Sequence, residues 1–232
     1  MSITQLARPF LLHRAKEIEK RSLNTEEVQR SVLAALVARA EQTRWGREYG
    51  YKSVGSYETF AGRVPVCTYE ELKGHIDRMR QGEADVLWPG RVQWYAKSSG
   101  TTNDKSKFIP VSADGLRDTH YAGGRDAVAL YLRNHPKSKI FDGRALILGG
   151  SHAPNYNLPH SLVGDLSAIL IENINPLVNL LRVPMNSTAL LADFEEKRDR
   201  IAHEALKKNV TNLSGVPSWM MSVISRVLEL SG

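Results

Sequence analysis

The sequence runs Lys97-Ser98-Ser99-Gly100-Thr101-Thr102-Asn103-Asp104-Lys105-Ser106-Lys107 between two apolar segments, residues 92–96 and 108–111. The apolar segments are predicted strands, and the small and polar residues between them indicate a loop. Glycine lets the backbone turn tightly and expose its N–H groups to an anion. Hydroxyl groups donate to phosphate oxygens, and lysine adds a point charge. This composition suits a triphosphate, but an ordinary Ser/Thr-rich turn has the same composition.

The segments on either side of this loop predict alternating helices and strands. Before the loop, a helix over 24–42 is expected to be capped by Asn24 with Glu27, and a helix over 68–80 by Thr68 with Glu71. After it come a helix from Ser112 to about 132, a strand over 144–148, a long loop over 151–164, helices near 165–182 and 188–208, a strand over 210–213 and a helix over 218–230. Strands separated by long helices predict an α/β fold with a mainly parallel sheet flanked by helices.

Composition limits the class of protein. The 232 residues are 42% apolar and 24% charged, which is typical of a soluble globular chain. A single cysteine, Cys67, excludes an intramolecular disulfide framework and a cysteine-rich zinc site. The first residues lack the apolar core of a secretory signal, and no run approaches the roughly 18 apolar residues of a membrane span. We therefore expect a cytoplasmic protein with no membrane partner.

The formal net charge of +6 fits either a nucleic-acid partner or an anionic small molecule. The basic residues are scattered among acidic ones, however, and no basic run has interleaved aromatic residues. A solvated surface of mixed charge is the simpler interpretation, and we expect no nucleic-acid partner.

The loop does not match the two common nucleotide-binding motifs. The pattern G-x-x-x-x-G-K-[ST] is absent because no second glycine precedes Lys105 or Lys107, and G-x-G-x-x-G does not occur. The order Ser-Ser-Gly-Thr-Thr instead resembles the phosphate loop of adenylate-forming enzymes, the superfamily of acyl-CoA ligases and luciferases. In most of those the lysine follows a shorter loop, whereas Lys107 stands one place later here.

Residues 98–110 resemble more specifically the first motif of the auxin-responsive Gretchen Hagen family of acyl-acid amido synthetases. Residues 43–50, 60–71, 82–90 and 215–219 resemble other segments of that family, so the resemblance spans nearly the whole chain. It implies the N-terminal part of the large domain of a luciferase-like enzyme. It also implies a reaction in which a small carboxylic acid and ATP form an acyl-adenylate, with Mg²⁺, and an amino acid or other amine then forms the amide.

The resemblance also assigns residues. Ser98, Ser99, Thr101, Thr102 and Lys107 would contact the phosphates, and Gly100 would allow close approach of the backbone. No catalytic residue and no metal ligand is assigned from the sequence. Asp104 could lie near magnesium, although a solvated loop tip is the simpler interpretation.

Acyl-substrate contacts are implied for Tyr121 and Arg125, which lie one helical turn apart. Arg125 could equally be a surface arginine beside Asp126. The 151–164 loop, with its histidines, asparagine and Tyr156, could line a pocket.

We expect a helical segment over 1–90 and an α/β nucleotide-binding core over 91–232 that is incomplete at its C-terminus. Family members are much longer than this chain, and their second and third nucleotide motifs would lie beyond residue 232. The chain therefore resembles an N-terminal fragment or a truncated product, inactive alone. Two alternatives remain: an acyl-CoA ligase of the same superfamily, and a truncated, non-catalytic binding module.

Overall fold

The structure is a computed structural model that describes residues 2–98 and 106–232. The chain forms two units, which we describe separately. The hairpin unit comprises Lys16–Thr119 and Asn155–Val163, and the parallel-sheet unit comprises Met1–Ala15, His120–Pro154 and Gly164–Gly232. Each unit contains residues from both sides of position 90, and the division of the chain at that position stays a prediction.

The hairpin unit is mostly helical. Its helices are α2 (Thr25–Ala40), α3 (Arg44–Glu48), η1 (Tyr51–Ser53), α4 (Tyr57–Arg63), α5 (Tyr69–Arg80), α6 (Ala113–Gly115) and η3 (Pro154–Tyr156), and α1 (Ile3–Ser22) enters it from the other unit. The strands β1 (Trp94–Lys97), β2 (Phe108–Val111) and β4 (Leu162–Gly164) form a sheet in the order β2-β1-β4. β1 and β2 are antiparallel, with Lys97 opposite Phe108 and Trp94 opposite Val111.

Of the two helix N-terminal caps predicted in this unit, one is confirmed and the other is wrong. Thr68 and Glu71 form the complete capping box that opens α5, as the sequence predicts. The predicted cap at Asn24 is wrong, because its side-chain amide donates to the carbonyl of Lys20 (3.1 Å) and makes no capping bond to α2. The physical reason is α1, a helix that was not predicted from the sequence: its last carbonyl groups lie within reach of the Asn24 amide.

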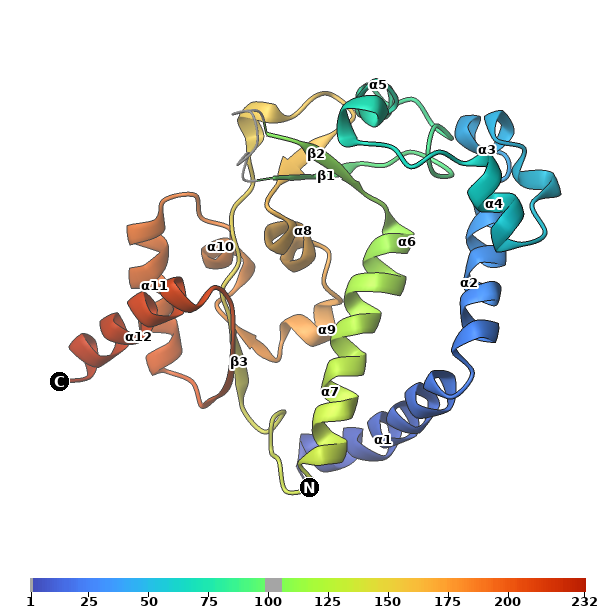
Figure 1. Ribbon diagram of the computed structural model, residues 1–232. Coiled ribbons are helices and arrows are strands. Elements are labelled where there is room, and N and C mark those ends of the chain that lie inside the picture. The colour runs from blue at the N-terminus through green and yellow to red at the C-terminus, as the bar shows by residue number, and fades with distance from the viewer. Residues whose placement is uncertain (1, 99–105) are drawn as a thin grey trace. The chain divides into compact units, whose positions relative to one another are not determined.

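The parallel-sheet unit contains α7 (Ala122–Asn134), β3 (Arg144–Ile147), α8 (Leu166–Glu172), α9 (Pro176–Asn179), β5 (Arg182–Val183), α10 (Asn186–Ala189), α11 (Phe194–Leu206), β6 (Val210–Ser214) and α12 (Pro217–Ser231). β3 is the central strand and pairs in parallel with β5 and with β6. Helices α11 and α12 pack on each other beside this sheet (Figure 1). The α/β class predicted from the sequence is therefore confirmed, and the parallel strands belong to this unit.

Apolar side chains from the central strand and its helices form the core of the parallel-sheet unit. The buried residues are Leu146, Leu148, Val183, Ile201, Met220 and Val223. A second cluster joins α1 to α7 through Leu11, Ala15, Ala129 and Leu132. The first cluster packs the carboxyl end of β3 against α11 and α12.

The two long helices predicted after residue 165 are wrong as continuous elements. The first breaks at Pro176, which starts α9, while the Asn175 side chain accepts a hydrogen bond from the Leu177 N–H (2.9 Å). A proline inside a helix loses a backbone hydrogen bond and clashes with the preceding turn, so the chain starts a new helix there. The short strand β5 then separates α9 from α10, and Asp193 caps α11 as a separate helix.

The helix predicted from Ser112 forms with an interruption. The Ser112 hydroxyl accepts the Gly115 N–H (3.0 Å), and α6 is followed by a π-helical stretch, η2 (Leu116–Tyr121), before α7 begins. Such π-helical stretches widen the helix locally and are frequent at functional sites. The stretch ends at Tyr121, one of the residues implied in substrate binding.

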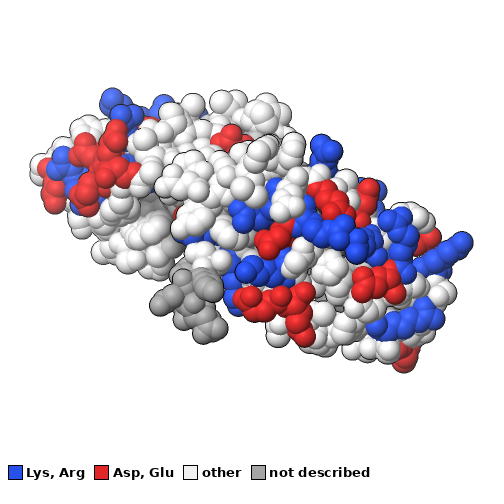
Figure 2. Space-filling view, turned by 90° about the horizontal axis from the view of Figure 1, so that it is seen from above, with Lys and Arg blue, Asp and Glu red and all other residues white. Residues whose placement is uncertain are grey.

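Charge is mixed on the face shown in Figure 2, where Lys and Arg lie among Asp and Glu. Over the described ranges, no helix combines the length and the apolar character needed to cross a bilayer.

Candidate functional site

The two ends of the polar loop are joined at the base of the β1–β2 hairpin. The backbone N–H of Ser98 donates to the carbonyl of Lys107 (2.9 Å), and the N–H of Lys107 donates to the Ser98 hydroxyl oxygen (3.0 Å). This pair extends the hairpin ladder by one step beyond Lys97 and Phe108. We call Lys97, Ser98, Lys107 and Phe108 the loop stem. The structure therefore brings together Ser98 and Lys107, the first and last residues of the predicted phosphate loop.

The other predicted phosphate-loop residues cannot be placed in the same way. Ser99, Gly100, Thr101 and Thr102 lie outside the described residues. The two predicted strands that flank these residues do form, because β1 ends at Lys97 and β2 begins at Phe108.

The two lysines of the stem lie on opposite faces of the hairpin. Residues directly opposite each other in an antiparallel pair share a face, and neighbours along a strand alternate. Lys97 therefore shares a face with Phe108, and Lys107 shares the other face with Ser98. The Lys97 ammonium lies 4.3 Å from the centre of the Tyr156 ring, whereas the Lys107 ammonium lies 5.5 Å from that of Tyr69. Lys107 thus has the looser aromatic contact and stands beside the Ser98 hydroxyl.

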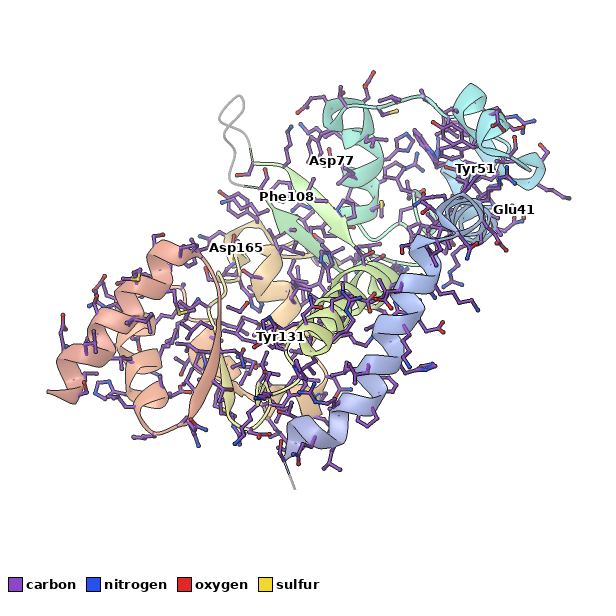
Figure 3. The ribbon with its side chains drawn as sticks, turned by 60° about the horizontal axis from the view of Figure 1, so that its bottom comes forward. Glu41, Tyr51, Asp77, Phe108, Tyr131 and Asp165 are labelled. Atoms are coloured by element: carbon purple, nitrogen blue, oxygen red, sulfur yellow. The ribbon has the colours of Figure 1, made fainter. Side chains whose placement is uncertain are left out.

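Arg80, at the end of α5, supports the stem from the Lys97 side. Its guanidinium carbon lies 3.9 Å from the centre of the Phe108 ring, and its Nη2 donates to the carbonyl of Tyr156 (2.6 Å). The rings of Phe108 and Tyr156 are themselves in contact, with centres 5.7 Å apart. Arg80 therefore ties α5, β2 and η3 together; Phe108 is labelled in Figure 3.

Tyr69, the first residue of α5, supports the loop stem from the Lys107 side. Its hydroxyl oxygen accepts the backbone N–H of Phe108 (2.9 Å), so the hairpin is attached to both ends of α5. From the sequence, Tyr156 is predicted only as a pocket residue, and Arg80 and Tyr69 have no predicted role. No local pattern could have found them, because Arg80 and Tyr156 are 76 positions apart.

The two residues implied in substrate binding lie in the parallel-sheet unit. The Tyr121 hydroxyl donates to the carbonyl of Leu170 (2.9 Å), and burial raises the pKa of Tyr121 above its ordinary value. Arg125 is half exposed, and its Nε lies 3.7 Å from a carboxylate oxygen of Asp126. Asp126 also forms a two-bond pair with Arg14, with both distances 2.7 Å. The contact with Asp126 matches the alternative in which Arg125 is a surface arginine, and a substrate role stays a prediction.

A second polar site, which the sequence analysis missed, lies at the carboxyl end of β3. Lys197 is only 6% exposed, and its ammonium donates to the carbonyls of Gly149 (2.9 Å) and Gly150 (2.8 Å). Burial lowers the pKa of Lys197, and the nearby carboxylate of Asp165 opposes that shift. A buried lysine without an ion pair is rare, because taking its charge out of water is costly.

Metal binding has no support in the described part of the chain, where no group of three or more His, Cys, Asp or Glu side chains is placed to hold an ion. Of the histidines in the 151–164 loop, His160 packs its ring against Gly82, and His152 pairs with Gly164 in an isolated bridge.

Two solved structures share this fold. A GH3.15 acyl acid amido synthetase superposes with a TM-score of 0.73 at 21% identity, covering 93% of this chain and 38% of that one. The structure of AtGH3.15 acyl acid amido synthetase in complex with 2,4-DB gives a TM-score of 0.72 at 22% identity, and the match covers 89% of this chain and 36% of that one. The fold is therefore that of the corresponding part of these synthetases.

The sequence comparisons lead to the same group. The model of the GH3 family N-terminal domain matches residues 14–230. The chain belongs to the GH3 family, which confirms the resemblance seen in its motifs. Indole-3-acetic acid-amido synthetase GH3.15 of Arabidopsis thaliana is 33% identical over 100 residues, covering 43% of this chain and 17% of the relative. Indole-3-acetic acid-amido synthetase GH3.2 of the same plant is 30% identical over 127 residues, covering 53% and 23%. The chain thus corresponds to a minor part of each relative.

Proposed function

We propose that this chain is the N-terminal part of an ATP-dependent acyl-acid amido synthetase in the cytoplasm. The observation that carries the proposal is the loop stem, in which a lysine and a serine close a hydroxyl-rich loop on one face of a hairpin. Family membership and the shared fold support it. The partners are a small carboxylic acid and an amino acid or other amine.

Lys107 and Ser98 would hold the phosphates of ATP. The Ser98 oxygen accepts the Lys107 N–H, which does not use the hydroxyl's own hydrogen, so that hydrogen can donate to a phosphate oxygen. The Lys107 ammonium shares this face and offers a charge-assisted bond. Ser99, Gly100, Thr101 and Thr102 complete the proposed loop.

ATP supplies the leaving group: attack of the substrate carboxylate at the α-phosphate gives the acyl-adenylate and pyrophosphate. Cations and N–H donors that face the phosphates stabilise the charge that develops on them. We expect Mg²⁺ to accompany ATP, and we assign it to no residue of the described chain, because no carboxylate or histidine cluster there fits a metal.

Tyr121 and Arg125 are the proposed contacts of the acyl acid. The bond from the Tyr121 hydroxyl to the Leu170 carbonyl fixes the position of its ring, which then offers an apolar face to the acyl group. The half-exposed Arg125 guanidinium can form a two-bond pair with a carboxylate.

The test uses a longer protein that contains this chain and is as long as its relatives. It is incubated with ATP, Mg²⁺ and a panel of carboxylic acids, and AMP release is measured with an amino acid mixture or with coenzyme A. Amino-acid-dependent AMP release with an amide product is expected. Release that depends on coenzyme A instead would identify an acyl-CoA ligase. No carboxylate-dependent release across the panel would favour a non-catalytic binding module.

A further inference from the structure

The first helices of the hairpin unit surround a cavity of about 420 Å³. The volume lies within the usual range for ligand pockets, about 300–1,000 Å³. Every residue that lines the cavity belongs to the hairpin unit, whereas the proposed contacts of the acyl acid, Tyr121 and Arg125, belong to the parallel-sheet unit. The cavity is therefore built without those residues. Its wall includes Leu36 of α2, Trp45 of α3, Tyr51 of η1, Phe60 of α4, Cys67 and Trp88.

Hydrogen bonds fix the corner between α2 and α3, which forms one wall of the cavity. The Thr43 hydroxyl accepts the N–H of Gly46 (2.9 Å) and donates to the carbonyl of Ala40 (2.7 Å). A Cβ at position 46 would collide with the carbonyl oxygen of Ala40, so only glycine lets α3 approach the end of α2 this closely. Trp45, within α3, is thereby held at a defined place in the wall.

The segment that carries Trp88 is attached to α3. The backbone N–H of Trp45 donates to the carbonyl of Val86 (3.0 Å). The indole N–H of Trp88 donates to a carboxylate oxygen of Asp114 (3.0 Å), which fixes the position of the ring. Trp88 therefore offers the cavity its ring, because its one side-chain donor is already used.

η1 and α4 form the third wall. Arg63, the last residue of α4, donates from its guanidinium to the carbonyl of Gly50 (3.1 Å), just before η1. The rings of Tyr51 and Phe60, one from each of these helices, have centres 6.1 Å apart; Tyr51 is labelled in Figure 3. Because hydrogen bonds fix each wall, the cavity has its shape before any ligand arrives, as is usual for small-molecule sites.

The wall of the cavity carries no charge. Among the described residues, no Lys, Arg, His, Asp or Glu lines it. Burial raises the pKa of Tyr51, and a hydrogen bond with the Trp45 side chain opposes this rise, so the phenol stays neutral at pH 7. A carboxylate or ammonium group of a ligand would leave water without gaining an ionic partner, which is costly. The lining therefore selects against an ionised ligand.

Aromatic rings stand on several sides of the cavity, on α3, η1, α4 and the segment before β1. A flat ring of a ligand can contact them edge to face or in offset stacks, and a saturated ring makes these contacts less well. Leu36 and the other aliphatic side chains of α2 add apolar area. The chemistry that matches this lining is an uncharged aromatic molecule.

We propose that this cavity is a binding site for an uncharged aromatic small molecule. The aromatic rings of the wall contact the faces and edges of the ligand, and Leu36 contacts it from α2. The inference goes beyond the proposed function and does not depend on it, because it uses no residue of the loop stem and neither Tyr121 nor Arg125. No covalent bond forms or breaks in the cavity.

Cys67 makes binding in the cavity measurable. It is the only cysteine in the sequence, it is partly exposed and it lines the cavity, so its alkylation by iodoacetamide reports on this place. The 232-residue chain is alkylated with rising concentrations of 2-naphthol, and intact mass gives the modified fraction, with Cys67→Ala as the blank. At about ten times its dissociation constant, 2-naphthol should slow the reaction about tenfold. No protection up to the solubility limit of 2-naphthol overturns the proposal.

Two related molecules test the chemistry of the ligand. 2-Naphthoate carries a carboxylate on the same rings and should bind at least about tenfold more weakly than 2-naphthol, because the cavity has no partner for its charge. Decahydro-2-naphthol keeps the hydroxyl but has no aromatic ring, and it should bind about threefold more weakly. Equal protection of Cys67 by 2-naphthol and by either of these molecules overturns the proposal.

Two variants of α2 test the place of binding. Leu36 lines the cavity and is 50% exposed, whereas Val32, one turn earlier and 46% exposed, is not part of the lining. Leu36→Glu should weaken the protection by 2-naphthol about tenfold, because it adds a charge to the apolar wall. Val32→Glu is the matched control and should leave the protection unchanged. If Leu36→Glu does not fold, Leu36→Ser decides, with an expected loss of about threefold; unchanged protection in a folded Leu36 variant overturns the proposal.

The longer protein tests the other occupant that an apolar cavity can have, a further segment of the same polypeptide. Cys67 of the longer protein should react with iodoacetamide at about the rate seen in the 232-residue chain, and 2-naphthol should protect it to the same extent. A Cys67 that is shielded in the longer protein without any added molecule, and gains no protection from 2-naphthol, would show that the polypeptide itself fills the cavity and would overturn the proposal.

Discussion

The two lysines of the loop stem differ in their surroundings although only ten positions separate them. The Lys97 ammonium lies 4.3 Å from the centre of the Tyr156 ring, on the face of the hairpin where Arg80 covers Phe108. Lys107 lies on the opposite face, beside the Ser98 hydroxyl. Alternation along a strand produces this difference. The lysine with the looser contact, Lys107, is the one that the resemblance assigns to the phosphates.

Replacement of Lys107 by methionine should reduce ATP use by the longer protein about ten- to hundred-fold, because a charge-assisted hydrogen bond contributes roughly 1.5–3 kcal/mol. Stability should change by no more than about 0.5 kcal/mol, as is usual for a side chain near the surface. Pyrophosphate exchange with the substrate acid measures the first effect, and urea unfolding measures the second.

Two other lysines serve as controls for this variant. Lys97→Met changes the opposite face of the hairpin and should have the smaller effect on exchange. Lys105→Met tests a lysine that lies outside the described residues. A normal rate for Lys107→Met with a collapsed rate for Lys105→Met would transfer the phosphate role to Lys105.

Tyr95, in the middle of β1, is fully buried, and in the described structure its hydroxyl has no hydrogen-bond partner. Tyr95→Phe should therefore leave the free energy of unfolding at pH 7 unchanged or raise it by up to about 1–3 kcal/mol, the cost of an unsatisfied buried group. Urea unfolding of both proteins checks this. A loss of stability above about 1 kcal/mol would show that the hydroxyl has a partner.

Tyr95 also makes the stability of the protein depend on pH. Burial raises the pKa of Tyr95 from 10.0 to about 12. Between these values the unfolded chain releases the proton while the folded chain keeps it, so stability falls as pH rises through this window. The Tyr95→Phe variant lacks this contribution, and its stability should fall less than that of the wild type between pH 10 and 12.

At the scale of elements, α5 is defined by signals at both ends. Its start has the Thr68–Glu71 capping box. Its end has a Schellman motif, in which the N–H of Gly82 donates to the carbonyl of Met79 (3.0 Å) and that of Glu83 donates to the carbonyl of Arg78 (3.1 Å). Because both ends are fixed, α5 presents Tyr69 and Arg80 to the two sides of the hairpin at defined positions.

Gly82→Ala should destabilise the protein by about 1–3 kcal/mol, since residue 82 has a left-handed conformation that costs energy for alanine. Its φ is 93°, and a Cβ there would lie 2.6 Å from the His160 ring. Gly74→Ala, in the exposed middle of the same helix with open space around it, is the matched control and should stabilise by about 0.4–1 kcal/mol. Equal effects of the two variants in urea unfolding would contradict the assigned helix end.

At the scale of the whole molecule, the chain matches the fold of a much longer synthetase over only 38% of that structure's length. The described residues include the loop stem and the proposed substrate contacts Tyr121 and Arg125. They provide no group of side chains suited to hold a metal ion.

We accordingly expect residues 1–232 alone to lack carboxylate-dependent ATP–pyrophosphate exchange, while a longer protein with the length of its relatives has it. The physical reason is that a phosphate loop alone fixes neither the adenine and ribose nor the metal. Both proteins are assayed under the same conditions, with unfolding curves to confirm that each is folded. Robust exchange by residues 1–232 would contradict this account.

Local patterns in the sequence were sufficient to predict several features of the protein. The Thr68 capping box, the Ser112 cap, the flanks of the polar loop and the family itself follow from residues within a few positions of each other. Caps and turns depend on one or two neighbouring backbone groups, and a motif is a continuous string. The free energies of these caps and turns come from contacts between neighbouring residues, so the sequence alone determines them.

Only the tertiary structure decided the rest. Asn24 contacts a carbonyl of a helix that was not predicted, and Arg80 reaches Tyr156 across 76 positions. Lys197 and Asp165 both contact residues 149–151, just after β3, because α8 and α11 pack around that segment. Each of these contacts joins groups that are distant in the chain, and its strength depends on burial and exclusion of water. Neither burial nor proximity is encoded in any single segment, so these sites exist only once the elements have packed.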